Sequence, residues 1–173
     1  WIGIAGSITS VKLEGSFIKA LPNSCHAWFK GMNNLDANCI DLTYLNTNDV
    51  TDMSSMFDGC SSLKNLDLGS LDTSKVTSME DMFSNCSSLI SVNVKSFNTK
   101  KVSNMSSMFA NCKISKVDNG CKFKVVTSHE MASCFQATAG GGGYSLPDDF
   151  ALPDGVTNLL YAFYQGGNTN FPA

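Results

Sequence analysis

The chain has 173 residues, of which 43% are hydrophobic, and its formal net charge at neutral pH is −3. This length and composition predict one folded domain with a substantial core and exclude intrinsic disorder. The basic residues are scattered singly, which excludes the clustered Lys/Arg footprint of a protein that binds nucleic acid or an anionic membrane. No apolar run approaches the roughly 18–20 residues of a membrane span, so we expect no membrane insertion.

The N-terminal part of the chain, before the first clear repeat, is an irregular segment with Pro22 near its end and a candidate first strand at 11–13. We interpret 1–24 as an N-terminal cap, because the terminal units of repeat proteins are atypical. The chain begins at Trp1 without a methionine or a signal peptide. We therefore expect a fragment of a longer protein or a mature form of it.

A repeated phrase organises the rest of the chain. It reads DVTDMSSMFDGCSSL, then KVTSMEDMFSNCSSL, then KVSNMSSMFANC. Its phenylalanines extend into a longer series with nearly even steps, namely Phe29, Phe57, Phe83, Phe109, Phe135 and Phe163. A regular period of roughly 20–50 residues is typical of stacked repeat architectures, so the series predicts about six coils of a solenoid.

Each repeat carries a short apolar stripe around its phenylalanine. In the second copy the stripe is Met53, Met56 and Phe57, at positions i, i+3 and i+4 that share one face of a helix. Six positions before most of the phenylalanines stands a Ser, Thr or Asn, a residue type that begins helices. Glu80 follows Thr77 by three positions, as in a capping box. The pattern predicts one short helix per repeat.

A strand pattern follows each predicted helix. Residues 63–68 and 89–94 both read L-x-x-L-x-L, and shorter versions occur at residues 40–42 and 114–118. Polar corners of the type Asn/Asp-Thr come next and favour a turn. One strand, one corner and one helix per repeat predict an α/β solenoid whose strands stack in parallel about 4.8 Å apart.

The predicted organisation is a single solenoid domain over residues 1–173. Repeats one to five occupy residues 25–138, and residues 156–173 form the last repeat and a C-terminal cap. Residues 139–155, which include four consecutive glycines, are interpreted as a loop insertion. A phosphate-binding role for this glycine run is not expected, because no Lys-Ser/Thr follows it.

When the repeats are aligned on their phenylalanines, equivalent positions form columns, and most of the seven cysteines fall in such columns. Cys60, Cys86 and Cys112 share one position, while Cys25 and Cys134 stand where other repeats carry mainly methionine. Because cysteine and methionine replace one another at equivalent positions, we expect these five cysteines to be buried, free thiols that act as small hydrophobic residues. Two cysteines lie outside the columns and are expected to be paired or exposed, namely Cys39 and Cys121. There is no C-x-x-C pair, so we expect no metal and no cofactor.

Two Cys/His pairs are conceivable as nucleophile and base, Cys25 with His26 and Cys134 with His129. In each pair the cysteine belongs to the apolar stripe. A cysteine-dependent hydrolase is therefore retained only as a remote alternative, and we expect a protein that is not an enzyme.

The outward positions of the predicted strands form a polar ladder. The candidate partner-binding residues are Asp41, Asp67, Asn93 and Asp118 in the ladder, with Lys64 and Lys116 beside it. Extended faces of this kind are common binding surfaces in solenoids. The ladder predicts contact with a protein or a glycan; the alternatives are a Ca²⁺ site and a solvated strand face.

The phrase D-T-S-x-V-T-x-M-x-x-M-F-x-x-C-x-x-L resembles the repeat of BspA-type leucine-rich-repeat surface proteins, closely over residues 45–112 and recognisably over 25–166. This resemblance implies a leucine-rich-repeat-like solenoid in a secreted or cell-surface bacterial protein, with a role in adhesion or partner binding. It implies no catalytic residue. In the fifth and sixth copies Thr138 and Gly166 stand in place of the cysteine, which is a departure from the family pattern.

The expected function is a non-catalytic interaction module, extracellular or on a bacterial surface, whose partner is a protein or glycan of a host or neighbouring cell. The alternative is a structural spacer that displays another domain. The sequence does not indicate an oligomeric state.

Overall fold

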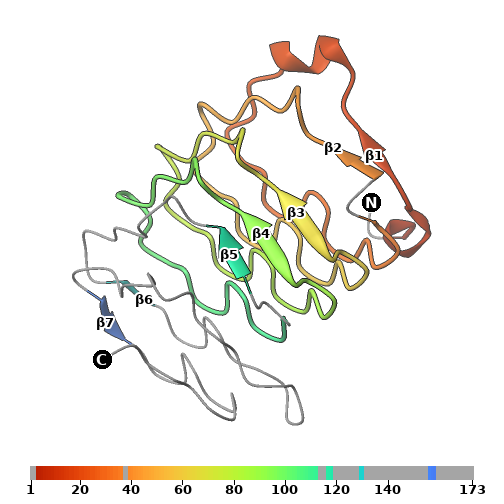
Figure 1. Cartoon of the computed structure of the whole chain (residues 1–173). Coiled ribbons are helices and arrows are strands. Elements are labelled where there is room, and N and C mark those ends of the chain that lie inside the picture. Colours follow the sequence, from red (N-terminus) through yellow and green to blue (C-terminus); the bar gives the residue numbers. More distant parts are fainter. Residues whose placement is uncertain (1–2, 37–38, 113–115, 119–128, 131–155, 159–173) are drawn as a thin grey trace.

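The computed structural model of the chain describes residues 3–36, 39–112, 116–118, 129–130 and 156–158. The predicted loop insertion, the cysteines at positions 121 and 134, and the last two phenylalanines of the series lie outside these residues. In the described part, successive repeats lie side by side in the order of the sequence, and the N-terminal segment lies at one end (Figure 1).

Short parallel strands run along one side of the molecule (Figure 1). The N-terminal segment contributes two 3-10 helices, η1 (Ala5–Ser7) and η2 (Gly15–Lys19), and β1 (Val11–Lys12). The repeats contribute β2 (Ile40–Asp41), β3 (Asn65–Asp67), β4 (Ser91–Asn93) and β5 (Lys116–Asp118). These strands lie where the alternation of apolar and polar residues predicts them. β1 pairs with β2 in one sheet, and β3, β4 and β5 form another.

The pairing register follows the repeat. Asp67 lies opposite Asn93, which lies opposite Asp118, so equivalent residues of successive repeats are neighbours. Further along, β6 (His129–Glu130) pairs in parallel with β7 (Val156–Asn158), and Glu130 lies opposite Asn158. The members of that pair are as far apart in the sequence as Phe135 and Phe163, so the pairing matches the last step of the phenylalanine series.

The structure differs from the sequence prediction where helices were expected. Residues 25–31, 53–59, 79–85 and 105–111, here called the turn segments, contain no α-helix. In each turn segment the residue two before the phenylalanine has a positive φ, as at Ser55 (54°) and Asp81 (54°). The residue two after it does too, as at Gly59 (77°) and Asn85 (59°). An α-helix requires φ near about −60° throughout, so this backbone cannot be helical.

Hydrogen bonding between repeats explains this conformation. In the second turn segment the N–H groups of Ser55, Phe57 and Gly59 donate to carbonyls of the third over 2.8–2.9 Å, and that of Met53 donates over 3.0 Å to the carbonyl just before it. The intervening N–H groups of Met56 and Asp58 donate to the residue three positions earlier, as in β-turns. A short isolated helix is only marginally stable, whereas this arrangement satisfies alternate N–H groups across each boundary between the four described turn segments.

The predicted helix-capping residues have a different role in the structure. The hydroxyl of Thr51 donates to the carbonyl of Asn23 over 3.2 Å, that of Thr77 to Thr51 over 3.0 Å, and that of Ser103 to Thr77 over 3.1 Å. The capping box at Glu80 is replaced by a bond from the Asn104 side-chain amide over 3.1 Å. These side chains therefore link repeats and do not cap helices.

The core is a column of identical side chains. The rings of Phe29, Phe57, Phe83 and Phe109 stack with centroids 5.1, 5.7 and 5.2 Å apart. The methionines of the apolar stripes and the leucines and valines of the strands are buried around this column. Each repeat thus buries its stripe against its neighbours.

Buried threonines at the corners offer a first test of the stacking. The Thr73 hydroxyl, which is fully buried, accepts a hydrogen bond from the Asn98 N–H over 2.7 Å. We expect Thr73→Val to lower the free energy of unfolding by about 1–3 kcal/mol in urea denaturation, because that amide loses its acceptor. The exposed Thr9 is the control, and Thr9→Val should change stability by less than about 0.5 kcal/mol. Equal losses would contradict the corner contact.

Candidate functional site

The sheet is interrupted between β2 and β3, and a polar hollow of about 500 Å³ lies at the interruption. The stretch from Phe29 to Asp41 is longer than the equivalent stretch from Phe57 to Asp67, so the first repeat has extra chain before its strand. The hollow is lined by residues at and beyond the C-terminal ends of the strands: Ile40, Asp41, Leu42, Thr43, Asp67, Gly69, Ser70 and Asn93.

Three of the predicted partner-binding residues meet at this hollow. Asp41, Asp67 and Asn93 come from β2, β3 and β4, and each accepts a hydrogen bond from the backbone N–H two positions later, over 3.0, 2.9 and 3.1 Å. The Asn93 side-chain amide also donates to Asp67 Oδ1 over 2.8 Å. These three side chains therefore form an ordered row, and each of them closes the loop after its strand.

The Asp41 carboxylate is held in its charged form. The Thr43 hydroxyl and backbone N–H donate to it, and the Lys12 ammonium adds a smaller favourable field, so the pKa of Asp41 lies below its usual value. The hollow thus presents negative charge and carbonyl-type oxygens at neutral pH.

Gly69 allows a close approach of two side chains in the hollow. A Cβ added at this position would lie 2.9 Å from Asn93 Nδ2 and 3.1 Å from Asp67 Oδ1, so these side chains would have to shift. Sequence reasoning missed Gly69, Ser70 and Thr43, which lie just after the strands. The available signal was a small or hydroxyl residue two or three positions beyond each Asp or Asn of the ladder.

Of the other predicted site residues, Lys64 does not line the hollow, and Lys116 and Asp118 are described only by their backbone. Lys64 is exposed and immediately precedes β3, where its carbonyl accepts from the N–H groups of Ile90 and Ser91. Lys116 and Asp118 lie in β5, opposite Ser91 and Asn93 in the pairing, and their side chains lie outside the description. The structure therefore brings together three of the six predicted residues.

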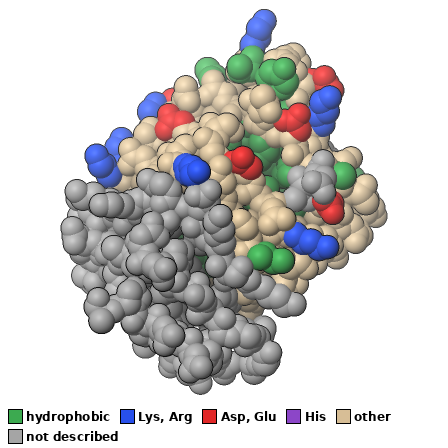
Figure 2. All heavy atoms as spheres, viewed as in Figure 1, with side chains coloured by type: hydrophobic (Ala, Val, Ile, Leu, Met, Phe, Trp, Pro, Cys, Tyr) green, Lys and Arg blue, Asp and Glu red, His purple; other side chains and the backbone are tan. Residues whose placement is uncertain are grey.

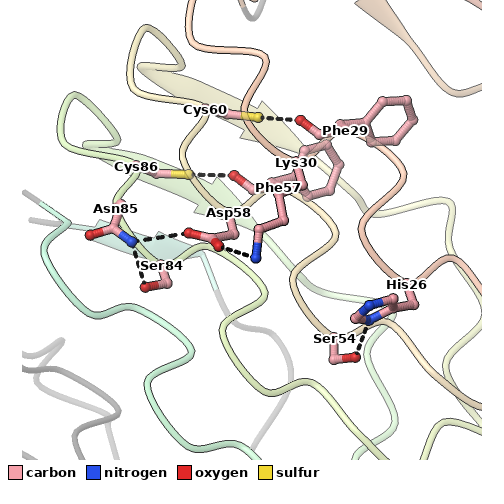
Figure 3. Close-up of polar contacts among 10 residues, drawn as sticks. All are labelled: His26, Phe29, Lys30, Ser54, Phe57, Asp58, Cys60, Ser84, Asn85 and Cys86. Carbon is pink, nitrogen blue, oxygen red and sulfur yellow. Dashed lines mark hydrogen bonds and ion pairs between the residues drawn. The ribbon is translucent and has the colours of Figure 1, made fainter. Parts of the chain in front are cut away.

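A second polar row connects the turn segments (Figure 3). Lys30 Nζ lies 2.8 Å from Asp58 Oδ2, Asn85 Nδ2 donates to Asp58 Oδ1 over 3.0 Å, and Asn111 Nδ2 donates to Asn85 Oδ1 over 2.8 Å. The bond to Asp58 raises the pKa of Lys30. Because these groups satisfy one another's hydrogen-bonding capacity, the row links repeats. It leaves a binding partner fewer groups to bond than the hollow does.

The cysteines behave as their columns predict in the described part of the chain. Cys25, Cys60 and Cys86 are buried and free, Cys112 is buried, and Cys39 is exposed and free. The thiols of Cys60 and Cys86 donate to the carbonyls of Phe29 and Phe57 over 3.0 and 3.1 Å (Figure 3). Burial raises the pKa of Cys25 and of Cys60 to about 12.

His26 bonds to a serine in the neighbouring turn segment. Its Nδ1 lies 2.7 Å from Ser54 Oγ (Figure 3), and that hydroxyl donates to Asp52 Oδ1 over 2.6 Å. Since the serine proton is directed to Asp52, the His26 nitrogen must be the donor to Ser54, opposite to the proton flow that a general base needs. Cys25 is buried and its pKa is raised, so neither the Cys25 thiol nor the Ser54 hydroxyl is set up as a nucleophile.

The described residues contain no group of three or more His, Cys, Asp or Glu side chains placed to hold a metal ion. Across the same residues no helix is long and apolar enough to cross a membrane. The face in Figure 2 shows Lys side chains interspersed with Asp and Glu and no field of a single sign.

Parallel strands in a repeat register, with a polar hollow at their ends, define a tandem-repeat protein. The chain matches, over residues 23–141, the family described as "Mycoplasma protein of unknown function, DUF285", and it belongs to this family. No curated protein and no solved structure matched the chain.

Proposed function

We propose that the chain is a leucine-rich-repeat-like solenoid of about six coils, of the BspA type. The stacked phenylalanines, the parallel strand pairs and the register that returns at β6 and β7 support continuous stacking. In this proposal each coil has one strand and one turn segment, where the α/β prediction had a helix.

The proposed function is a non-catalytic interaction module, secreted or on a bacterial surface, that serves adhesion by binding a partner of a host or neighbouring cell. The observation that carries it is the convergence of Asp41, Asp67 and Asn93 on one hollow. Asp67 Oδ1 accepts two hydrogen bonds, while no described group donates to Oδ2. Carboxylate, amide and hydroxyl groups in a shallow recess suit the hydroxyl groups of a glycan, and the exposed Ile90 on the strand side suits contact with a protein.

A binding screen against glycans and extracellular matrix proteins tests this function. We expect Asp67→Lys and Ser70→Arg to weaken binding of the partner by at least about tenfold, because the first reverses a charge in the hollow and the second fills it. Glu14→Lys is the matched control, since it makes the same charge change at an exposed residue outside the hollow.

The two hollow variants separate a local effect from unfolding. Asp67→Lys removes the acceptor for Gly69 and Asn93, whereas Ser70→Arg leaves those bonds in place. A partner that binds all three variants like the parent protein would contradict the site. If the parent binds nothing in the screen, the result favours the structural spacer over the interaction module.

A further inference from the structure

The break in the sheet between β2 and β3 has a width that suits one more strand (Figure 1). Neighbouring strands of a sheet lie about 4.8 Å apart, so a strand inserted between two others separates them by about 9.6 Å. Most of the Cα–Cα distances between β2 and β3 exceed 8 Å. The separation is therefore too large for β2 and β3 to pair with each other, and it is compatible with a single strand between them.

Contacts on both sides of the break join the same two repeats. Before the strands, the Phe29 N–H donates to the Met56 carbonyl over 2.9 Å. After the strands, the Asp72 N–H donates to the Thr47 hydroxyl over 2.8 Å. The two repeats thus meet at the turn segments and at the corner and separate at the strands, so the break is a local opening built into the fold.

The β2 edge that faces the break carries unpaired backbone groups. Successive residues of a strand direct their N–H and C=O groups to opposite edges. The Asp41 carbonyl accepts a hydrogen bond from the Leu13 N–H on the β1 side, over 3.3 Å. Ile40 and Leu42 therefore direct their backbone groups to the other edge, and no described strand pairs with that edge.

The β3 edge across the break complements the β2 edge. The Leu68 N–H donates to the Asn93 carbonyl on the β4 side, over 3.0 Å, so Asp67 directs its N–H and C=O groups to the break. A parallel strand in the break can bond to the Ile40 carbonyl and the Leu42 N–H on one side. It can bond to both backbone groups of Asp67 on the other side, as neighbouring coils do elsewhere in the sheet.

The side chains beside the break define which peptide fits. The central residue of an added strand lies between Asp41 and Asp67 in the ladder, and two carboxylates favour Lys or Arg there because opposite charges on neighbouring strands attract. The residues before and after it point inward, towards the buried Leu42 and Leu66, and small apolar side chains suit these positions. A strand residue occupies about 160 Å³ at ordinary strand and sheet spacings, so the hollow of about 500 Å³ has room for about three residues.

We propose that the break between β2 and β3 binds an extended peptide of a partner protein as a parallel strand of about three residues, with a basic residue between two small apolar ones. This inference rests on the proposed interaction module and names the chemistry of its partner. Backbone hydrogen bonds to both edges supply the binding, and the two aspartates supply the preference for a basic residue.

Selection from a displayed library of random heptapeptides tests the proposal with the whole chain. We expect the enriched peptides to share an apolar–basic–apolar core. A labelled synthetic copy of the most enriched peptide should bind the parent saturably in fluorescence anisotropy. N-methylation of its basic residue should weaken binding by at least about tenfold, because the methyl group removes the N–H that donates to the Ile40 carbonyl.

Asp67→Asn tests the charge while it keeps a side-chain oxygen for the bonds from Gly69 and Asn93. Asparagine already occupies the equivalent position of the next repeat, so the variant is expected to fold. It should weaken the selected peptide by about two- to fivefold and leave unchanged a peptide with Gln in place of the basic residue. Glu14→Gln, at an exposed residue outside the hollow, is the matched control and should affect neither peptide.

Amide hydrogen exchange locates the bound peptide. Saturating peptide should slow the exchange of the Leu42 and Asp67 amides by at least about tenfold, because both become hydrogen-bonded within a sheet. The Glu14 amide, which lies outside the hollow, should exchange at the same rate with and without peptide.

The proposal is overturned if no peptide is enriched, if the N-methylated peptide binds as tightly as the unmodified one, or if the Leu42 and Asp67 amides exchange at unchanged rates. Equal losses of the basic and the Gln peptide in Asp67→Asn would refute the preference for a basic residue. A glycan that binds the parent while no peptide is enriched refutes this inference alone and supports the interaction module. Failure of both the peptide selection and the binding screen counts against the module itself.

Discussion

Replacing Phe83 by alanine is expected to lower the free energy of unfolding by about 3–5 kcal/mol. The side chain is fully buried, and its ring lies between those of Phe57 and Phe109 at 5.7 and 5.2 Å, nearly parallel to both. Removing it leaves a cavity in the middle of the column that the flanking repeats cannot fill without losing their hydrogen bonds to one another. Urea denaturation of the parent and the variant measures the effect.

Ile90→Ala is the control for this substitution. Ile90 is 45% exposed and immediately precedes the β4 strand, so its truncation should cost less than about 1 kcal/mol. A loss below about 1 kcal/mol for Phe83→Ala as well would mean that the phenylalanine column is not the core of the fold.

Stability is expected to fall steeply with rising pH above about 9, where thiols of an unfolded chain ionise. Burial raises the pKa of the Cys25 and Cys60 thiols to about 12 and raises that of Cys86 further, with additional contributions from Cys112 and Cys60. A folded-state pKa above the unfolded value means that the stabilisation is complete below the unfolded pKa. It is lost as the pH rises towards the folded pKa, because only the unfolded chain releases its protons.

Each such thiol should lower the unfolding free energy by up to about 1.4 kcal/mol per pH unit in this window. Urea denaturation between about pH 8 and pH 11 measures the slope. In the double variant Cys60→Ala/Cys86→Ala the slope should be shallower by about twice the contribution of one thiol. Lysines and tyrosines contribute equally to the slopes of both proteins. Parallel slopes would contradict the burial of these thiols in the folded state.

The repeat register was the feature that the sequence predicted best. The phenylalanine column and the strand positions follow from spacing alone, because stacked repeats must place equivalent residues side by side. The buried cysteines follow from the same columns, since Cys60, Cys86 and Cys112 share one environment.

The turn segments were predicted wrongly because their apolar spacing fits two conformations. Met53, Met56 and Phe57 share a face in a helix, but they are also buried together in consecutive turns. The position two after each phenylalanine carries Gly59 or Asn85 in successive repeats, residue types that tolerate a positive φ. That signal is also compatible with the end of a helix, so it could not decide between the two. The hydrogen bonds between repeats favour the turns over the helix, and these bonds join residues that are far apart in the sequence.

The candidate site was partly predictable. Asp41, Asp67 and Asn93 follow from strand alternation, but the hollow beside them depends on the break between β2 and β3. An apolar cavity between the N-terminal cap and the first repeat depends on how the cap lies against Trp28 and Phe29, which no periodic pattern in the N-terminal segment encodes.

Cross-linking within one column tests the stacking of the repeats most directly. Thr51, Thr77 and Ser103 are exposed, and each later residue donates its N–H to the carbonyl of the earlier one, over 2.8 and 2.7 Å. In a Cys39→Ser/Cys121→Ser background, pairs of cysteines placed at these positions can be treated with dibromobimane, which becomes fluorescent only when it joins two thiols a few ångströms apart. The native protein should react at Thr51→Cys/Thr77→Cys and at Thr77→Cys/Ser103→Cys. The pair Thr51→Cys/Ser103→Cys, separated by two repeats, should not react. Equal reaction of all three pairs, or reaction of none, would contradict the stacking of the repeats in this register.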